Sequence, residues 1–267
     1  MIVLQVYSMN WVEPADRHRL RVIGMSHESF DASVHSGRYA RIKRFYRTVD
    51  LFLVLTATDA RRFEWNGFNN VGVMHNPLTF YPERGSDLST QTVIATGRYD
   101  VEKGYDRLID AFARIAPSHR DWSLKIFGRG PLRRSLREQA KRLGLDKQVQ
   151  LPGLAQDVET ELLRSSIFAL SSINEGLPIS LGEAMACGVP SVAFDCAPGV
   201  REMVTDGEDG IVVPPLDVPA LARGIERLIE DEPLRRRMGA RARESARRFT
   251  KETILDRWEE IFERVER

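Results

Sequence analysis

Two glutamates between residues 174 and 190 have the types and spacing that could do chemistry. Pro178 suits the first position of a helix and Gly188 its C-terminal cap, so a short helix is predicted just after Glu175. Glu183 then lies about a turn and a half inside that helix. With a rise of 1.5 Å per residue, the two carboxylates are about 10 Å apart and could contact opposite ends of one elongated ligand. This separation argues against two carboxylates acting on one glycosidic bond. The alternative is a buried helix in which Glu183 is ion-paired.

Short apolar runs without polar alternation recur from residue 91 onward, as in strands that are buried on both faces. They are Val93–Ala95, Leu124–Phe127, Val149–Leu151, Phe168–Leu170, Ser191–Phe194 and Ile211–Val213. Between them lie helix-like segments at Tyr105–Ala116, Pro131–Leu143, Asp157–Ser165 and Ala220–Ile229. This alternation predicts βαβ units, and therefore a parallel sheet with helices on both faces.

Three glycines mark the side of this sheet where a ligand is expected. Gly97, Gly128 and Gly153 each follow a predicted strand. Open parallel sheets bind ligands at the carboxyl ends of their strands. The helix near Pro178 begins on the same side, and the free N–H groups of its first turn can bind a phosphate.

The first 76 residues differ from the rest of the chain. Three apolar runs, Leu20–Met25, Leu51–Leu55 and Val71–Met74, with helical stretches between them, predict part of a second α/β unit. Residues 77–91 have the composition of a linker. Apolar residues on one face of residues 250–267 predict an amphipathic C-terminal helix.

The composition excludes several classes of protein. Of 267 residues, 42% are apolar and 29% charged, which is typical of globular proteins. Lys and Arg total 39 and Asp and Glu 38, so no nucleic-acid partner is expected. Two cysteines, Cys187 and Cys196, make no disulfide framework and fit a reducing compartment. No membrane-spanning run or signal-peptide pattern is present, so we expect a cytoplasmic protein.

Several motifs, taken in order, resemble one enzyme family. The two glutamates and the Cys187-Gly188-Val189-Pro190 turn are similar to a segment of the retaining nucleotide-sugar glycosyltransferases of the GT-B fold. This group is called family 4, or glycosyl transferases group 1. Further similarity lies at Ser26–Glu28, Asn76-Pro77, Gly97–Gly104, Phe127–Pro131, Pro198–Glu202 and Asp206–Val212. The matching motifs cover roughly residues 20–267.

The resemblance implies the domain organisation of a GT-B protein. Residues 92–249 would form a complete Rossmann-like domain that binds the nucleotide sugar. The linker at 77–91 would join it to a partial acceptor-side α/β domain at residues 1–76. The helix at 250–267 would pack back on that N-terminal part.

The resemblance also implies a role for each matching residue. Glu175 would lie beside the transferred sugar, and His27 would line the cleft from the opposite domain. Glu183 would accept hydrogen bonds from the ribose hydroxyls. Other residues would bind the donor, with Arg98, Lys103, Gly176, Leu177 and Pro178 at the diphosphate and Gly128, Arg129 and Gly130 at the nucleoside.

Several of these roles have structural alternatives. Arg98 and Lys103 could instead be ordinary surface charges at the start of a helix. The Gly128–Gly130 pair also suits an ordinary turn, and His27 suits a hydrogen-bonded turn histidine. Glu202 resembles a residue at the nucleotide end of the cleft, but a structural role is favoured for it.

The chemistry of the leaving group predicts metal independence. A departing nucleoside diphosphate gains negative charge as the glycosidic bond breaks, and fixed cations and a helix N-terminus stabilise that charge. The sequence has neither an Asp-x-Asp motif nor a histidine cluster. We therefore expect an enzyme without a metal or other cofactor.

The expected reaction moves a sugar from a UDP- or GDP-linked donor to a hydroxyl acceptor, with retention, in polysaccharide or glycolipid synthesis. The acceptor would be a sugar or lipid-linked. Arg38, Arg41, Arg44 and Arg47 lie on a basic helix-like segment that could contact the inner face of a membrane. A solvated helix face is the alternative.

The chain departs from the family at its N-terminus. Complete members have two full Rossmann-like halves, and the N-terminal strand with its glycine-rich loop is missing here, which predicts a truncated member. A catalytically incomplete fragment that binds nucleotide sugars is therefore the alternative function. Apolar surface left exposed would favour a homodimer.

Overall fold

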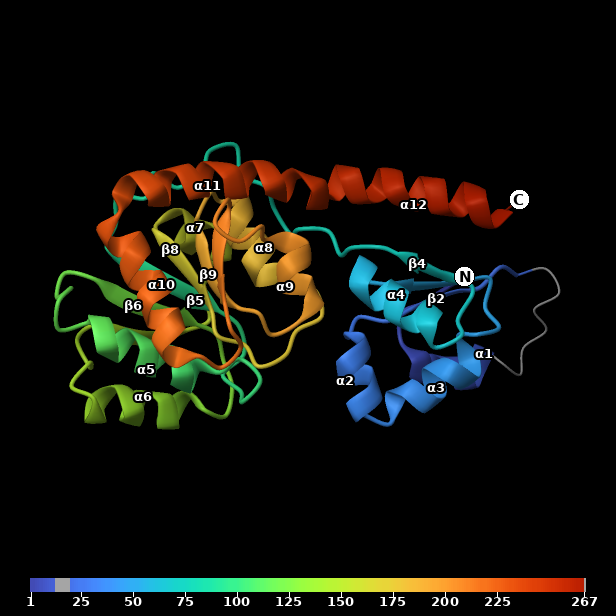
Figure 1. Ribbon diagram of the computed structural model, residues 1–267, viewed down its shortest axis with the longest axis horizontal. Coiled ribbons are helices and arrows are strands. Elements are labelled where there is room, and N and C mark those ends of the chain that lie inside the picture. Colours follow the sequence, from blue (N-terminus) through green and yellow to red (C-terminus); the bar gives the residue numbers. More distant parts are fainter. Residues whose placement is uncertain (13–19, 267) are drawn as a thin grey trace.

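The protein contains two parallel β-sheets joined by an extended segment (Figure 1). The computed structural model describes residues 1–12 and 20–266. The N-terminal sheet has the strand order β1-β2-β3-β4, and the C-terminal sheet has the order β10-β9-β8-β5-β6-β7. Every neighbouring pair of strands is parallel.

The N-terminal sheet is built from short strands. Its strands are β1 (Ile2–Val3), β2 (Ile23–Met25), β3 (Leu51–Val54) and β4 (Val71–Val73). Its helices are the 3-10 helix η1 (Val6–Ser8) and the α-helices α1 (Met9–Val12), α2 (Phe30–His35), α3 (Arg38–Phe45) and α4 (Ala57–Trp65). The three expected strands are present, whereas β1 was not expected. A strand of two residues has no periodicity from which it could be predicted.

Tyr46 explains how so short a strand as β1 is held. Its fully buried hydroxyl donates hydrogen bonds to the carbonyls of Val3 and Met25, at 3.1 and 3.3 Å. The ring lies against Gly24, where an added Cβ would be 2.6 Å from it. One side chain therefore joins β1 to β2 and requires a glycine at position 24 of β2.

The C-terminal sheet confirms the predicted alternation of strands and helices. Its strands are β5 (Thr92–Thr96), β6 (Ser123–Phe127), β7 (Val149–Gly153), β8 (Ile167–Leu170), β9 (Ser191–Phe194) and β10 (Gly210–Val213). Its α-helices are α5 (Tyr105–Ile115), α6 (Arg133–Arg142), α7 (Val158–Leu163), α8 (Ile179–Ala186), α9 (Pro198–Met203), α10 (Val218–Glu230) and α11 (Glu232–Ala246).

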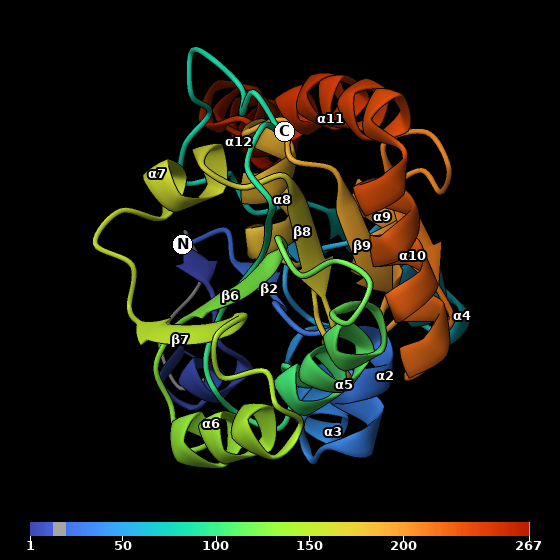
Figure 2. The same cartoon turned by 90° about the vertical axis from the view of Figure 1, so that its left-hand side faces the viewer.

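Helices cover both faces of this sheet, as predicted (Figure 2). Val93 and Ala95 pack with the residues of α5 and α10, whereas Ile94 between them packs with those of α8. Successive residues of a strand point to opposite faces, so a strand covered on both sides is apolar throughout. This is why these strands were visible as continuous apolar runs.

Residues 74–91 contain no helix or strand, yet they are fixed to the C-terminal sheet unit. The Leu78 N–H donates to the Phe249 carbonyl at 2.8 Å, and the Ser86 N–H donates to that of Cys187 at 2.7 Å. The Arg243 guanidinium of α11 donates to the Pro82 carbonyl. The segment is therefore a packed strap across α8 and α11, which neighbour each other.

The chain ends in η2 (Arg247–Phe249) and α12 (Lys251–Glu266). Figure 1 shows α12 running alongside the N-terminal sheet. Trp258, Ile261 and Val265 pack against a core cluster that includes Met25 and Leu53 of that sheet. None of the described helices combines the length and the apolar character needed to span a bilayer.

Candidate functional site

The loops after β5 and β8 meet at an ion pair. Lys103 Nζ lies 2.6 Å from Glu175 Oε1, and the two side chains are 19% and 12% exposed. The Ser172 hydroxyl donates to the same carboxylate oxygen at 2.7 Å. The fold thus brings together a cation and a carboxylate that are 72 residues apart in the chain, at the carboxyl edge of the sheet.

The backbone around Lys103 fixes this pair. The Lys103 N–H donates to Asp100 Oδ1 at 3.1 Å, and its carbonyl accepts from the Ser171 hydroxyl at 2.8 Å. Gly104 is left-handed, with φ of +58°, and a Cβ there would lie 2.2 Å from the Ser171 carbonyl oxygen. Only glycine allows this close approach of the two loops.

Arg98 lies on the same loop as Lys103 but is placed differently. Its side chain is 72% exposed and pairs with Asp100 at 3.1 Å and Glu102 at 3.2 Å. An exposed ion pair of this kind contributes little to stability, so an anionic ligand can readily compete for the guanidinium. The diphosphate role of Arg98 stays a prediction.

Helix α8 carries the remaining residues predicted at the diphosphate. It begins at Ile179, so Pro178 precedes the first helical residue instead of being it. The Pro178 carbonyl accepts the first hydrogen bond of the helix, from the Leu181 N–H at 3.0 Å. Gly188, with φ of +68°, donates its N–H to the Met185 carbonyl, which confirms the predicted C-terminal cap.

Glu183 is half-buried on α8. Burial raises the pKa of its carboxyl, and a hydrogen bond from the Thr79 hydroxyl partly opposes that shift. Within residues 1–12 and 20–266, no cation forms an ion pair with it. The alternative in which Glu183 is ion-paired is therefore wrong for the described part of the chain.

His27 reaches this edge from the N-terminal sheet, where it follows β2. Its carbonyl oxygen would lie 2.3 Å from a Cβ added at Gly176, so the two backbones are in close contact. Burial lowers the pKa of the His27 imidazole, and a hydrogen bond with Asn76 opposes the shift. Two predicted site residues from opposite halves thus lie side by side.

Gly128 and Gly130 are needed for packing between loops. A Cβ at Gly128 would lie 1.8 Å from the Gly97 carbonyl oxygen, and one at Gly130 would lie 2.4 Å from that of Tyr99. The Tyr99 N–H donates to the Arg129 carbonyl at 2.9 Å. The structural-turn interpretation accounts for both glycines without a nucleotide.

Tyr105 was not singled out from the sequence, yet it lies beside the site. A Cβ at Gly97 would be 2.6 Å from its hydroxyl, which is buried and has no hydrogen-bond partner in the described part of the chain. Burial, and then the charge of Glu175, raise the pKa of this phenol. Tyr105 is the first residue of α5, and nothing in the sequence around it marks this tyrosine as a residue of the site.

Glu202 of α9 joins the two halves. Its carboxylate accepts from the Ala57 N–H at the start of α4, at 3.4 Å, and lies 3.3 Å from His75 Nε2. The other ring nitrogen of His75 lies 3.3 Å from the Arg257 guanidinium of α12. The favoured structural role for Glu202 is supported by these contacts.

We expect Glu202→Gln to weaken the junction between the halves at neutral pH. The hydrogen bond to His75, the largest cause, holds the Glu202 pKa below its usual value. A lowered pKa adds stability above the ordinary carboxyl pKa, and this stability is lost as pH falls through the lowered value. Urea unfolding of Glu202→Gln and of exposed Glu208→Gln measures this. A Glu202-specific deficit at pH 7 that shrinks as pH falls below the ordinary carboxyl pKa is expected, and equal stability of both variants at pH 7 contradicts it.

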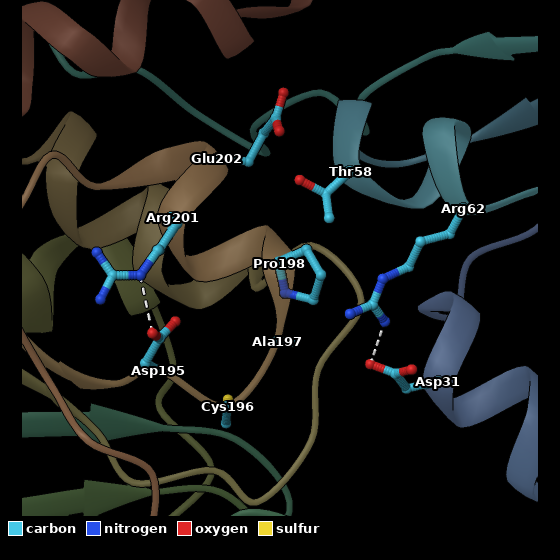
Figure 3. A pocket seen from close by; sticks show the side chains of 9 residues that line it. All are labelled: Asp31, Thr58, Arg62, Asp195, Cys196, Ala197, Pro198, Arg201 and Glu202. Atoms are coloured by element: carbon cyan, nitrogen blue, oxygen red, sulfur yellow. Dashed lines mark hydrogen bonds and ion pairs between the residues drawn. The ribbon is translucent and has the colours of Figure 1, made fainter. Parts of the chain in front are cut away.

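A polar cavity of about 360 Å³ lies between α2 and α4 on one side and the β9–α9 loop on the other (Figure 3). Two ion pairs face it, Arg201 with Asp195 at 2.8 Å and Arg62 with Asp31. The Thr58 hydroxyl and the Glu202 carboxylate add to its polar lining. Arg201 and Glu202 belong to a motif of the sequence, whereas Asp31, Thr58, Arg62 and Asp195 carry none.

The basic segment around α3 has partners within the protein. The Arg38 and Arg41 guanidinium groups lie over the Tyr7 ring, 5.5 and 4.8 Å from its centre. Arg47 donates to the carbonyls of Asn66 and Gly67, at 3.3 and 3.0 Å. Membrane contact through this segment stays a prediction.

Comparison with known proteins gives the family. The family model of the glycosyl transferases group 1 matches residues 81–245. An exopolysaccharide phosphotransferase of Streptomyces coelicolor is 42% identical over 187 residues, which are 70% of this chain and 20% of that protein. An uncharacterized glycosyltransferase of Haemophilus influenzae is 31% identical over 229 residues, 82% of this chain and 65% of that protein. The chain therefore spans less than two thirds of the length of these relatives.

A solved structure confirms the fold class. A mutant of S. aureus TarM, in complex with fondaparinux, alpha-GlcNAc-glycerol and UDP, has a TM-score of 0.86 at 21% identity. The similarity covers 98% of this chain and 55% of that one. The expected α/β architecture of the GT-B type, with Rossmann-like parallel sheets, is confirmed.

Proposed function

Because the chain belongs to the glycosyl transferases group 1 family, we propose that it transfers a sugar from a nucleoside-diphosphate donor to a hydroxyl acceptor. The observation that carries this proposal is the Lys103–Glu175 pair, 2.6 Å apart, at the carboxyl edge where open α/β sheets bind ligands. The backbone of His27 from the other half contacts Gly176 next to it. A donor bound there would meet residues of both halves.

The proposed diphosphate site uses fixed charges. Lys103 and the N–H groups at the start of α8, with Gly176, Leu177 and Pro178 leading into it, would bind the phosphates. Arg98 would exchange its exposed ion pairs with Asp100 and Glu102 for contacts with the phosphates. These groups stabilise the charge that develops on the leaving diphosphate, so the proposed reaction requires no metal ion.

The proposed transfer retains the configuration at the sugar, as in family 4. The bond from the anomeric carbon to the phosphate oxygen breaks while the bond to the acceptor oxygen forms on the same face. The acceptor proton passes to the departing phosphate. Glu175 would orient the sugar, and His27 would contact the sugar or acceptor from the opposite side.

The proposed nucleoside site includes Glu183, whose carboxylate would accept hydrogen bonds from the ribose. Gly128, Arg129 and Gly130 would lie beside the base. The tertiary structure gives the two glycines a packing role, so Glu183 is the residue that tests this site most directly. The UDP complex of the TarM relative favours UDP over GDP as the first nucleotide to examine.

Calorimetric titration with UDP and then GDP in EDTA, followed by a transfer assay with the corresponding sugar nucleotides, tests the function. We expect binding of one nucleotide, release of that diphosphate on transfer, and a product whose anomeric configuration, read by NMR, is that of the donor. A folded chain that binds neither nucleotide contradicts the proposal. An inverted product contradicts retention alone.

Glu183→Gln is expected to change stability and binding in opposite directions. The raised pKa means that ionising this carboxyl destabilises the folded chain as pH rises above the ordinary carboxyl value. The neutral variant should therefore be more stable than the wild type at pH 7. Losing a charged hydrogen bond to the ribose should weaken nucleotide binding about 10- to 100-fold. Urea unfolding and calorimetry at pH 7 measure both, and unchanged nucleotide affinity would remove Glu183 from the site.

A second candidate function is nucleotide-sugar binding without transfer. It is favoured by the small N-terminal sheet, whose strands β1 to β4 have only two to four residues each. Nucleotide binding combined with neither transfer nor donor hydrolysis would support this candidate.

The acceptor, in this proposal, is a sugar or lipid-linked molecule of polysaccharide or glycolipid synthesis, and the enzyme is a hexosyltransferase of the cytoplasm. Arg38, Arg41, Arg44 and Arg47 would hold it at the inner face of the membrane. Leu255 and Phe262 of α12, 51% and 41% exposed, would support a homodimer. Co-sedimentation with anionic vesicles and sedimentation velocity measure these two properties.

A further inference from the structure

Three potential ligand side chains come together on two packed elements away from the nucleotide edge. His119 lies in the turn after α5, and Glu226 and Glu230 lie four residues apart on α10. Helices α5 and α10 lie side by side (Figure 2). One nitrogen of the imidazole and one oxygen of each carboxylate all lie within 4.8 Å of one another.

The distances within this cluster leave an imidazole nitrogen without a hydrogen bond in the described part of the chain. His119 Nε2 is buried and has no hydrogen bond within the described residues. It lies 3.7 Å from Glu226 Oε1 and 3.8 Å from Glu230 Oε1, which is too far for hydrogen bonds. Ligand atoms of a tetrahedral zinc ion, bound at about 2.0–2.2 Å, are about 3.3 Å apart. The two distances from the imidazole exceed this value by about half an ångström, and the two carboxylate oxygens lie within 4.8 Å of each other. Rotation of the partly exposed glutamate side chains would let one ion bind all three atoms.

The turn that carries His119 is held in place from several directions. The His119 carbonyl accepts from Gln148 Nε2 and from the Trp122 N–H, both at 3.1 Å. The Arg235 guanidinium lies over the Trp122 ring, 5.4 Å from its centre, and donates to the Leu228 carbonyl of α10 at 2.6 Å. Such support orients a metal ligand before the ion arrives.

We propose that His119, Glu226 and Glu230 bind one zinc ion, with water as the fourth ligand. One imidazole and two carboxylates are ligands that zinc accepts. Helix α5 runs back from the Lys103 loop to the turn of His119, and its 11 residues span about 16 Å. The ion therefore lies at the opposite edge of the sheet from the donor site, where it joins α10 to the α5–β6 turn and plays no part in transfer.

Calorimetric titration of the untagged, metal-free full chain with Zn²⁺ tests the site. We expect one equivalent to bind, with affinity at least tenfold weaker in His119→Ala and in Glu226→Gln/Glu230→Gln. His35→Ala, which removes an exposed histidine of α2, is the matched control and should bind like the wild type. Co²⁺ should give a visible absorption band that is lost in His119→Ala.

Thermal unfolding shows whether each variant folds like the wild type, so that a loss of zinc binding can be assigned to the missing ligand. In EDTA the glutamine variants should unfold like the wild type, because their side chains are partly or largely exposed and keep their size. Added Zn²⁺ should raise the unfolding midpoint of the wild type only. No binding by the wild type, or equal binding by all variants, overturns the proposal and leaves a histidine between two carboxylates that pairs with them when protonated.

Discussion

Lys103→Ala should lower kcat/KM for sugar transfer by about 10²- to 10³-fold, the usual effect of removing one preorganised group that stabilises transition-state charge. Lys103 Nζ lies 2.6 Å from Glu175 Oε1 and the side chain is mostly buried, so the substitution removes a cation that the fold holds in place. Steady-state kinetics with the nucleotide sugar identified by calorimetry measure the effect. Arg114→Ala, which removes an exposed cation at the far end of α5, is the control. Activity within threefold of the wild type would contradict the diphosphate role.

The same substitution has a structural consequence that must be separated from the catalytic one. Without Lys103, the Glu175 carboxylate loses its cation while remaining mostly buried, and a charged hydrogen bond of this kind is worth about 1.5–3 kcal/mol. Lys103→Ala/Glu175→Gln removes the unpaired charge and should regain part of that stability. The double variant measures the stability cost alone, because Glu175 has its own proposed role in transfer. If Lys103→Ala is folded at the assay temperature and its transfer stays low, the loss is catalytic.

Gly128→Ala should destabilise the ligand-free protein by about 2–6 kcal/mol. A Cβ there would lie 1.8 Å from the Gly97 carbonyl oxygen, and the glycine has φ of +154°, where side chains are disfavoured. Backbone strain and overpacking each contribute about 1–3 kcal/mol. Because Gly97 and Gly128 follow neighbouring strands, relieving the clash would displace the edge at which the nucleotide is proposed to bind.

Gly144→Ala separates the two causes. Gly144 also has positive φ, +71°, but nothing lies within 4 Å of its added Cβ. This variant should lose about 1–2 kcal/mol from strain alone. Urea unfolding without nucleotide compares the two. Equal losses of unfolding free energy in the two variants would show that loop packing does not require Gly128. Contact with the nucleotide would then be the remaining explanation for this glycine.

Local sequence patterns predicted the C-terminal sheet well because β5, β8, β9 and β10 are buried on both faces. In β7 buried and exposed residues alternate, with Gln150 exposed, so the expected lack of polar alternation was wrong for that strand. Local patterns predicted other elements poorly where the pattern is weak. The α11 helix was not expected because its buried positions include Gly239, Ala242 and an arginine, Arg235, among many charged residues. The N-terminal strand β1 is held by the distant Tyr46, which no local pattern can show.

The sequence by itself determined the family, the parallel α/β architecture and the helix that carries Glu183, since these depend on residue order and periodicity. The tertiary structure decided which side chains meet. It pairs Lys103 with Glu175 across 72 residues and sets His27 against Gly176 from the other half. It also leaves the hydroxyl of Tyr105 without a hydrogen-bond partner among residues 1–12 and 20–266. Such contacts depend on how loops from separate strands converge at one sheet edge, and spacing along the chain does not contain that information.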